Sequence, residues 1–247
     1  MAEDNKMKAA IYAKTGEVKE VLTVRECHKP QVGNNQVLVE IYAAGMNPVN
    51  YKLVEGRLGI ATPSLPAIDG MDYSGVVVEL GNGCSNRLQV GDAVWGKANL
   101  TNRGTFAEYC VLPENCCFKK PQEISHAEAA SQGVVAFTGY QALIGTANLQ
   151  KGQKVLILAG SGGTGSFGIQ LAKNVLGAFV ATTCSTRNVE FVTSLGADKV
   201  IDYRSENWAD VLAGENYDVL YDCVGGETHW QDAHKILKPG GYFVVTH

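Results

Sequence analysis

Six residues at positions 160–165 form the strongest chemical motif of the sequence. They read Gly-Ser-Gly-Gly-Thr-Gly, directly after the apolar run VLILA (155–159) and before a stretch with helical spacing. In a strand–loop–helix unit of this kind, the glycines permit a tight turn and a close approach of the backbone to a diphosphate at the helix N-terminus. A flexible turn without a ligand is the alternative interpretation. The motif predicts these cofactor-binding residues: Gly160, Ser161, Gly162, Gly163, Thr164 and Gly165.

The end of the next predicted strand, AFVATTC (178–184), indicates which dinucleotide binds. A site that prefers NAD normally carries Asp or Glu there, where the carboxylate accepts hydrogen bonds from the ribose hydroxyls. This sequence continues instead with Ser185, Thr186 and Arg187, whose hydroxyls and guanidinium suit the 2′-phosphate of NADPH. We therefore predict NADPH as the cofactor, with Ser185 and Arg187 at its 2′-phosphate. A solvated surface arginine is the alternative for Arg187.

The elements that must position these residues differ between the two halves of the chain. The first half contains short β-type runs separated by Gly, Pro and Asn, which predicts an antiparallel barrel-like or sandwich-like domain. These runs are AAIYA, VLTVRE, QVLVEIYAAG, YSGVVVEL, AVWG and FAEYCVL. Two polar connections, 46–68 and 96–105, interrupt this half, and long loops of this kind often carry function.

A helical pattern begins after Pro121, where Ser125 is a candidate N-cap three residues before Glu128. Apolar strands then alternate with helices, and the series ends with a helix through HKILKPGG and a strand at YFVVT. This alternation predicts a parallel sheet covered on both faces, which is a doubly wound α/β fold. We place the two domains at residues 1–130 and 131–247.

Composition argues against several classes of partner. The 21 basic and 25 acidic residues give a net charge of -4, which provides no basic field for nucleic acid. The N-terminal residues lack the apolar core of a signal peptide, and no apolar run is long enough to span a bilayer. We therefore expect a cytoplasmic protein without nucleic-acid or membrane partners. Its seven scattered cysteines are predicted to be reduced thiols.

Several segments together resemble the zinc-independent medium-chain dehydrogenases/reductases, in the quinone oxidoreductase family of zeta-crystallin-like proteins and enone reductases. They are AGSGGTGSFGIQLAK, CSTRNVEFVTSLGAD, VIDYRSENW, YDCVGG, GMNPVNYKLVEGR, IDGMDYSGVVVELGNG and VGDAVWG. The resemblance implies an N-terminal GroES-like β-rich barrel domain for catalysis and substrate binding, followed by a Rossmann domain for NADPH. Relative to the family, we expect the chain to be C-terminally truncated, without the last strand and the returning C-terminal segment.

The resemblance also implies chemistry without a metal. Zinc-dependent relatives carry a Cys in the segment that matches Ala44–Tyr51 and a Gly-His-Glu where this chain has Gly70-Met71-Asp72. Cys110, Cys116 and Cys117 have no fourth partner for a structural zinc site. No metal site is predicted. Hydride transfer then requires an acceptor already activated by conjugation, such as a quinone or an α,β-unsaturated carbonyl.

Matching the family's motifs residue by residue implies further site residues. The predicted catalytic residues are Asn47, near the nicotinamide, and Lys52, which approaches the cofactor. A solvated lysine is the alternative for Lys52. Relatives usually carry Asp where this chain has Asn50, which puts any function of that carboxylate in question. The further predicted cofactor contacts are Thr138, Tyr203 beside the 2′-phosphate, and Val224 and Gly225 against the nicotinamide ribose. Tyr203 has the alternative of a core aromatic.

The predicted function is an NADPH-dependent oxidoreductase that transfers hydride to a quinone or an enone. The alternative is a non-catalytic NADPH-binding or sensor protein, or an inactive short isoform. RNA binding is a third possibility, but the sequence lacks basic clusters and aromatic platforms. Members of the family are commonly homo-oligomers, paired through the strand expected to be missing here. None of the five histidines is assigned chemistry, and His229 and His234 are interpreted as exposed helix positions.

Overall fold

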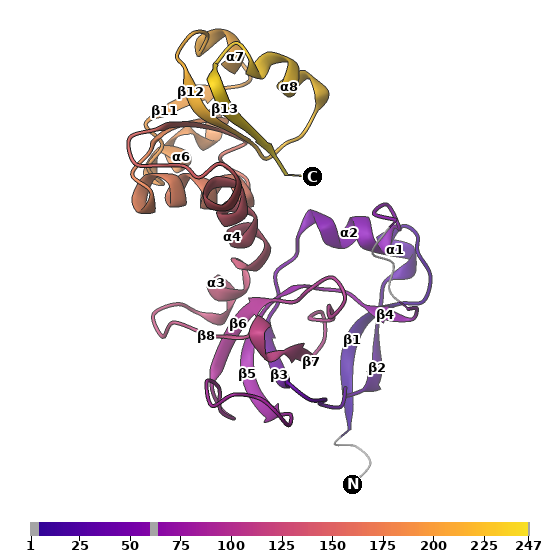
Figure 1. Cartoon of the computed structure of the whole chain (residues 1–247). Helices are drawn as coiled ribbons and strands as arrows, with labels where there is room; N and C mark the ends of the chain where they lie inside the picture. Colours follow the sequence, from indigo (N-terminus) through magenta and orange to yellow (C-terminus); the bar gives the residue numbers. More distant parts are fainter. Residues whose placement is uncertain (1–4, 60–63, 247) are drawn as a thin grey trace. The chain divides into compact units, whose positions relative to one another are not determined.

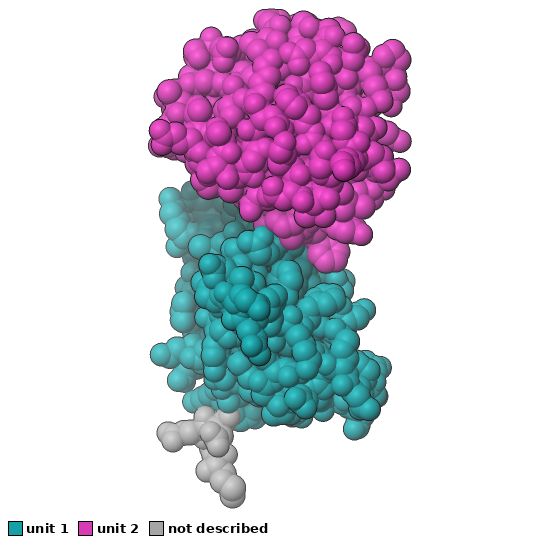
Figure 2. Space-filling model, turned by 90° about the vertical axis from the view of Figure 1, so that its left-hand side faces the viewer, with its two compact units in different colours: residues 1–134 teal, residues 135–247 magenta. Residues whose placement is uncertain are grey.

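A computed structural model describes residues 5–59 and 64–246 of the chain (Figure 1). The chain divides into two compact units, residues 1–134 and residues 135–247, which Figure 2 shows in teal and magenta. Across the described residues, no helix combines the length and the apolar character that crossing a membrane requires.

Unit 1 is built from two antiparallel sheets. A three-stranded sheet has the order β2-β1-β4, and a five-stranded sheet has the order β7-β3-β5-β6-β8. Its strands are β1 (Lys6–Tyr12), β2 (Thr23–His28), β3 (Gln36–Ala43), β4 (Ala67–Ile68), β5 (Asp72–Leu80), β6 (Ala93–Lys97), β7 (Tyr109–Pro113) and β8 (Phe118–Lys119). Each of the six predicted β-type runs overlaps one of these strands. Val39 of β3, Val77 of β5 and Leu112 of β7 are buried and pack with Tyr73 in one hydrophobic cluster. This cluster is the core against the larger sheet.

Short helices complete unit 1. They are α1 (Val18–Val21), α2 (Pro48–Val54), the 3₁₀ turn η1 (Glu114–Cys116) and α3 (His126–Ala130). The predicted N-cap of α3 is confirmed, because the Ser125 hydroxyl accepts from the Glu128 N–H at 3.2 Å and Glu128 accepts from the Ser125 N–H at 2.7 Å. Helix α2 lies inside the connection 46–68, for which the sequence analysis predicted no helix; residues 60–63 of that connection lie outside the described residues.

Unit 2 contains a five-stranded parallel sheet of order β11-β10-β9-β12-β13. Its strands are β9 (Lys154–Leu158), β10 (Phe179–Cys184), β11 (Lys199–Asp202), β12 (Tyr217–Asp222) and β13 (Leu237–Val245). The helical segments are α4 (Gly133–Tyr140) with its π-helical extension η2 (Gln141–Thr146), α5 (Gly163–Gln170) with its extension η3 (Leu171–Val175), the 3₁₀ turn η4 (Thr186–Asn188), α6 (Val189–Ser194), α7 (Trp208–Val211) and α8 (Glu227–Ala233).

Alternate residues of β9 pack on opposite faces of this sheet. Val155 and Ile157 belong to a core cluster with residues of α5, η3 and α6, whereas Leu156 and Leu158 belong to a second cluster with residues of α7 and α8. Both faces are therefore covered by helices, and the predicted doubly wound α/β fold is confirmed.

The predicted helix through HKILKPGG is wrong. Helix α8 ends at Ala233, and β13 already begins at Leu237. A helix interior is unfavourable at this segment because Pro239 has no N–H to donate, and Gly240 has a left-handed φ of 77°. The pairing of β13 with β12 shifts register across this segment, from Tyr217↔Leu237 to Val219↔Tyr242.

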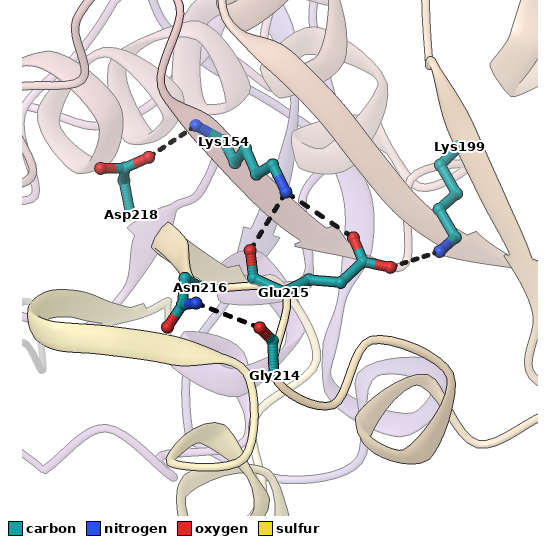
Figure 3. A network of polar contacts seen from close by, with 6 residues as sticks. All are labelled: Lys154, Lys199, Gly214, Glu215, Asn216 and Asp218. Carbon is teal, nitrogen blue, oxygen red and sulfur yellow. Dashed lines mark hydrogen bonds and ion pairs between the residues drawn. The ribbon is translucent and has the colours of Figure 1, made fainter.

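A polar network joins the starting ends of several strands of this sheet (Figure 3). The Glu215 carboxylate accepts from Lys199 Nζ at 2.8 Å and lies 3.9 Å from Lys154 Nζ. Lys154 also donates its N–H to Asp218 at 2.8 Å. Because Lys154 begins β9 and Lys199 begins β11, these contacts hold the sheet at the end opposite to residues 160–165.

The Glu215→Gln variant is expected to lower the free energy of unfolding of the chain by about 1 kcal/mol at pH 7. Lys199, its main hydrogen-bond partner, and Lys154 lower the pKa of Glu215 below the ordinary 4.5. The stabilisation is therefore present above pH 4.5 and is lost as the pH falls through the lowered pKa of the folded state. Urea denaturation of both proteins between pH 7 and pH 3 measures this.

The exposed Glu123 provides the matched control, since Glu123→Gln removes a carboxylate outside the network. A gap between wild type and Glu215→Gln that stays constant down to pH 3 would contradict the assigned ion pairs.

Candidate functional site

The loop at 160–165 connects β9 to α5 and is tied to β10. The Gly160 N–H donates to the Thr183 carbonyl at 2.9 Å, and the Ala159 N–H donates to the Thr183 hydroxyl at 3.0 Å. A Cβ at Gly160 would lie 2.0 Å from Thr182 Oγ1, and a Cβ at Gly165 would lie 2.3 Å from the Ala159 carbonyl oxygen. Glycine at these two positions is therefore required by close packing of the loop itself.

Helix α5 begins inside this loop. Gly162 is its extended N-cap, and Gly163, Thr164 and Gly165 form its first turn without any acidic side chain. The N–H groups of a first helical turn have no acceptors within the helix, and the helix dipole favours an anion at this end. The loop residues thus fit a diphosphate group, with the half-buried Ser161 beside them.

One side chain that the sequence analysis missed connects this loop to the end of β10. Asn188 Nδ2 donates to Ser161 Oγ at 3.0 Å and lies 3.3 Å from Ser185 Oγ. Ser185 is 5% exposed, whereas Arg187 on η4 is exposed. The structure thus brings the phosphate loop and Ser185 together through Asn188.

A carboxylate also lies near the end of β10. Asp202, the last residue of β11, accepts a short hydrogen bond from the Thr186 hydroxyl and a second one from the Arg204 N–H at 3.0 Å. These two contacts lower the pKa of Asp202. The Thr186 hydroxyl was predicted to suit the 2′-phosphate, but in the structure it donates its hydrogen bond to Asp202.

A pocket opens at the carboxyl ends of these strands. Leu158 of β9 pairs with Asp222 of β12 where the strand order reverses, which is the place where open α/β sheets bind ligands. The residues lining this pocket include Leu158, Ala159, Thr183, Tyr203, Arg204, Trp208, Val224, Thr228, His229 and Asp232. The alternative of a core aromatic is wrong for Tyr203, because its side chain is 57% exposed.

The turn after β12 forms one wall of this pocket, and a buried carboxylate holds it. Asp222 is fully buried, and its Oδ1 accepts from the N–H groups of Val224 at 2.8 Å and Gly225 at 3.0 Å. Its Oδ2 lies 2.9 Å from Nδ1 of His229. The expectation of an exposed helix position is therefore wrong for His229. His234 is exposed, as expected, but it follows the last residue of α8.

Thr138 lies on α4, away from the residues that line this pocket. It lies half-buried on α4, whose Gly139 packs against Phe167 of α5, with 2.9 Å between a Cβ placed at Gly139 and Phe167 Cδ1. Thr138 is thus on the helix that runs beside α5, and it does not line the pocket defined above.

In unit 1, Asn47 is held by a buried carboxylate. Asn47 Nδ2 donates to Asp72 Oδ2 at 2.8 Å, and the Val134 N–H donates to Asp72 Oδ1 at 2.8 Å. Asp72 is 1% exposed, and burial raises its pKa against the opposing effect of these two donors. Gly133 leaves room for the carboxylate, because a Cβ there would lie 2.3 Å from Asp72 Oδ1.

Helix α2 begins directly after Asn47, which is its extended N-cap, with Pro48 as the first helical residue. The Asn50 side-chain oxygen accepts from the Asn47 N–H at 2.8 Å. Asn50 therefore keeps the capping function that an Asp would also provide. Lys52 lies half-buried on the same helix.

Asn50 adjoins a second buried carboxylate. Asp69 lies 3.5 Å from Arg103 Nε, with both side chains almost completely buried. Burial raises the pKa of Asp69, while the Gly70 N–H, the Asn50 side chain and Arg103 act in the opposite direction. Arg103 also donates to the Leu100 carbonyl at 2.8 Å, within the connection 96–105. Through Arg103, this connection is held to Asp69.

An apolar pocket of about 330 Å³ lies beside Asn47 within unit 1, at the small end of the range for ligand sites. Apolar and aromatic side chains make up most of its lining, and Asn47, Asn50 and Asp69 are its polar members. The other residues that line it are Val18, Leu22, Met46, Pro48, Tyr51, Val54 and Phe106. This lining suits an uncharged, largely apolar molecule.

The seven cysteines are free thiols. Burial raises the pKa of Cys110 to about 12 and that of Cys117 to about 11, so both thiols are protonated at neutral pH. Within residues 5–59 and 64–246, no three His, Cys, Asp or Glu side chains are grouped so that they could hold a metal ion. Met71, where zinc-dependent relatives are expected to carry His, is buried.

Each of the two units contains a segment that matches a known protein family. Residues 33–122 match the alcohol dehydrogenase GroES-like domain, and residues 163–246 match the zinc-binding dehydrogenase family. The quinone oxidoreductase from Coxiella burnetii is similar in structure, with a TM-score of 0.88 and 34% identity over 97% of this chain and 75% of that chain. The chain belongs to the quinone oxidoreductase family of the medium-chain dehydrogenases/reductases. Unit 1 is its GroES-like domain, and unit 2 is its Rossmann domain.

Two curated relatives of this chain have names that state a reaction. The chain is 38% identical to 2-methylene-furan-3-one reductase of Solanum lycopersicum over 98% of its own length. It is 37% identical to the NADPH-dependent alkenal/one oxidoreductase, chloroplastic, of Arabidopsis thaliana over 97% of its length. The chain spans 62% of the length of each of these relatives.

Proposed function

We propose that this protein is an NADPH-dependent oxidoreductase that reduces quinones or α,β-unsaturated carbonyl compounds. The observation that carries the proposal is the hydrogen-bonded set of Ser161, Asn188 and Ser185, which joins the loop at 160–165 to the end of β10. The segment that follows β10 carries Arg187 and lacks the acidic residue typical of sites that prefer NAD. The names of the tomato and Arabidopsis relatives, a furanone reductase and an NADPH-dependent alkenal/one oxidoreductase, support the same chemistry.

Unit 2 supplies the groups for the cofactor in this proposal. The N–H groups of residues 162–165 bind the diphosphate, and Ser185 and Arg187 bind the 2′-phosphate. When bound, NADPH supplies a hydride. The remaining predicted contacts follow the family's motifs and are Thr138, Tyr203, Val224 and Gly225.

Unit 1 supplies the acceptor site. The apolar pocket beside Asn47 takes the carbon skeleton of the acceptor, which needs no charged partner. Asp72 orients Asn47 by accepting from its amide, so that the remaining Asn47 oxygen and backbone stay fixed at the pocket wall. Lys52 approaches the cofactor, as the family's motif implies.

We propose that the reaction requires no zinc. The position that carries a metal-binding Cys in zinc-dependent relatives lies in the segment of Asn47, whose amide is paired with Asp72, and Met71 offers a buried apolar side chain in place of an imidazole. Conjugation of the acceptor then spreads the negative charge that hydride addition leaves. A cytoplasmic location, the lack of a nucleic-acid partner and homo-oligomerisation stay predictions.

Fluorescence titration of the purified chain with NADPH and NADH tests the cofactor, and NADPH oxidation with 9,10-phenanthrenequinone and a 2-alkenal tests the acceptor. We expect tighter binding of NADPH than of NADH, and turnover that dialysis against a chelator leaves unchanged. Gly165→Ala should abolish NADPH binding, whereas Gly145→Ala, where a Cβ meets open space, should preserve it. Equal affinity for both cofactors, or no turnover with either acceptor, would contradict the proposal.

A further inference from the structure

His229 belongs to the pocket of unit 2 but has no function in the reaction proposed above. It is the third residue of α8, and it lines the pocket together with Thr228 and Asp232. The ring is fixed from two sides: Nδ1 lies 2.9 Å from the buried Asp222 carboxylate, and the Trp208 ring contacts it edge-on at a centroid distance of 6.1 Å. A half-buried histidine is therefore held in one orientation at a ligand pocket.

The hydrogen bonds of Asp222 determine which nitrogen of His229 carries the proton. Asp222 Oδ1 already accepts from two backbone N–H groups, and its Oδ2 lies 2.9 Å from Nδ1 of the ring. An ionised carboxylate can only accept a hydrogen bond, so the imidazole nitrogen that faces it must carry the hydrogen. Nδ1 is therefore the protonated nitrogen of the neutral ring. Nε2 then carries a lone pair and can only accept a hydrogen bond.

The other residues of the pocket define the shape of a fitting ligand. Tyr203 and Val224 present exposed aromatic and apolar surface, and Leu158 and Ala159 belong to the same lining. A flat ring system with hydrogen-bond donors on one edge fits such surroundings. Ser185 and the phosphate loop adjoin the ends of β9 and β10, from which Ala159 and Thr183 also reach this pocket.

We propose that His229 recognises the adenine base of NADPH, with Nε2 accepting a hydrogen bond from the exocyclic amino group. The inference rests on the proposed cofactor and adds a residue that distinguishes adenine from other bases. Asp222 is the positioning residue in this scheme, because it sets the tautomer of His229 and shapes the turn of Val224 and Gly225. In this proposal the turn contacts the adenosine half of NADPH, which replaces the nicotinamide ribose contact that the family's motif implied for Val224 and Gly225.

A comparison of NADPH with its deamino analogue, reduced nicotinamide hypoxanthine dinucleotide phosphate, tests the proposal directly. The analogue carries an oxygen in place of the amino group, so that it faces Nε2 with an acceptor instead of a donor. We expect wild type to bind NADPH about tenfold more tightly than the analogue, corresponding to one hydrogen bond. Fluorescence titration measures both dissociation constants without turnover.

Two variants separate recognition from structural support. His229→Phe keeps a ring against Trp208 but has no nitrogen, and His229→Asn keeps a donor for Asp222 but has no atom at the Nε2 position. Both should lose the tenfold preference for NADPH over the analogue. Reduced nicotinamide mononucleotide, which lacks the adenosine half, should bind wild type and both variants equally.

The outcomes distinguish this inference from the proposed function. If wild type binds NADPH and its analogue equally, or if the variants keep the preference, His229 does not recognise the base. If wild type binds neither NADPH nor the analogue, the proposed cofactor itself is wrong. His229→Phe and His229→Asn that lower the melting temperature without changing the preference would also overturn the inference.

Discussion

Asp72→Ala is expected to lower the free energy of unfolding of the chain by about 3 kcal/mol and to reduce kcat by about a hundredfold. The carboxylate is buried, and the variant leaves two donors, Asn47 Nδ2 and the Val134 N–H, without their acceptor. Each unsatisfied buried donor costs about 1–3 kcal/mol. Asn47 also loses the contact that fixes its side chain beside the apolar pocket.

Urea denaturation measures the loss of stability, and steady-state kinetics with a quinone measures kcat and KM. The affinity for NADPH should stay within about twofold of wild type, because the residues proposed to bind the diphosphate and the 2′-phosphate lie in unit 2. Ser74→Ala is the matched control: Ser74 is a buried polar residue of the same strand, and its hydroxyl donates to the Val94 carbonyl at 2.9 Å. This control should lose stability but keep kcat.

A double-mutant cycle with Asn47→Ala separates positioning from general destabilisation. If Asp72 acts through Asn47, Asp72→Ala should change kcat little in a chain that already lacks the Asn47 side chain. Independent, additive losses in kcat from the two substitutions would show that Asp72 does not act by holding Asn47.

The sequence predicts the elements of this fold well because their signals are local. Apolar alternation identifies the strands of unit 1, and the apolar run before Gly160 identifies β9. Helix α2 was missed although Asn47 and Pro48 are a recognisable N-cap and first helical residue, since Pro and Gly in the surrounding segment favoured a loop. The error at HKILKPGG has the opposite origin: Pro239 and Gly240 were placed inside a helix that neither residue favours.

The contacts of the site depend on strand order, which no local pattern encodes. Asn188 and Ser161 are 27 residues apart, and Asn47 and Asp72 are 25 apart, so that each pair meets only when its sheet has formed. Asp222 and His229 are only seven residues apart, but their contact requires the turn after β12. The motif therefore predicted the loop between β9 and α5, whereas the contacts of Asn188, Asp72 and Asp222 required the structure.

Arg187→Glu is expected to weaken NADPH binding by about a hundredfold, which corresponds to about 2.7 kcal/mol, and to leave NADH binding unchanged or tighter. The exposed guanidinium on η4 would be replaced by a carboxylate that repels the 2′-phosphate. The same carboxylate can accept from the ribose hydroxyls of NADH, as acidic residues at the end of the second strand do in sites that prefer NAD. Fluorescence titration with both cofactors measures the ratio of their dissociation constants.

Two neighbouring charges decide how this result is interpreted. Asp202 already places a negative charge beside Thr186, and Arg204 lines the pocket of unit 2. Arg204 is therefore the alternative candidate to Arg187 for binding the 2′-phosphate. Lys151→Glu produces the same change of charge on an exposed residue of unit 2 and should leave both affinities unchanged. If Arg204→Glu, and not Arg187→Glu, removes the preference for NADPH, the 2′-phosphate is bound from the end of β11, and only the loop and Ser185 keep their assigned functions.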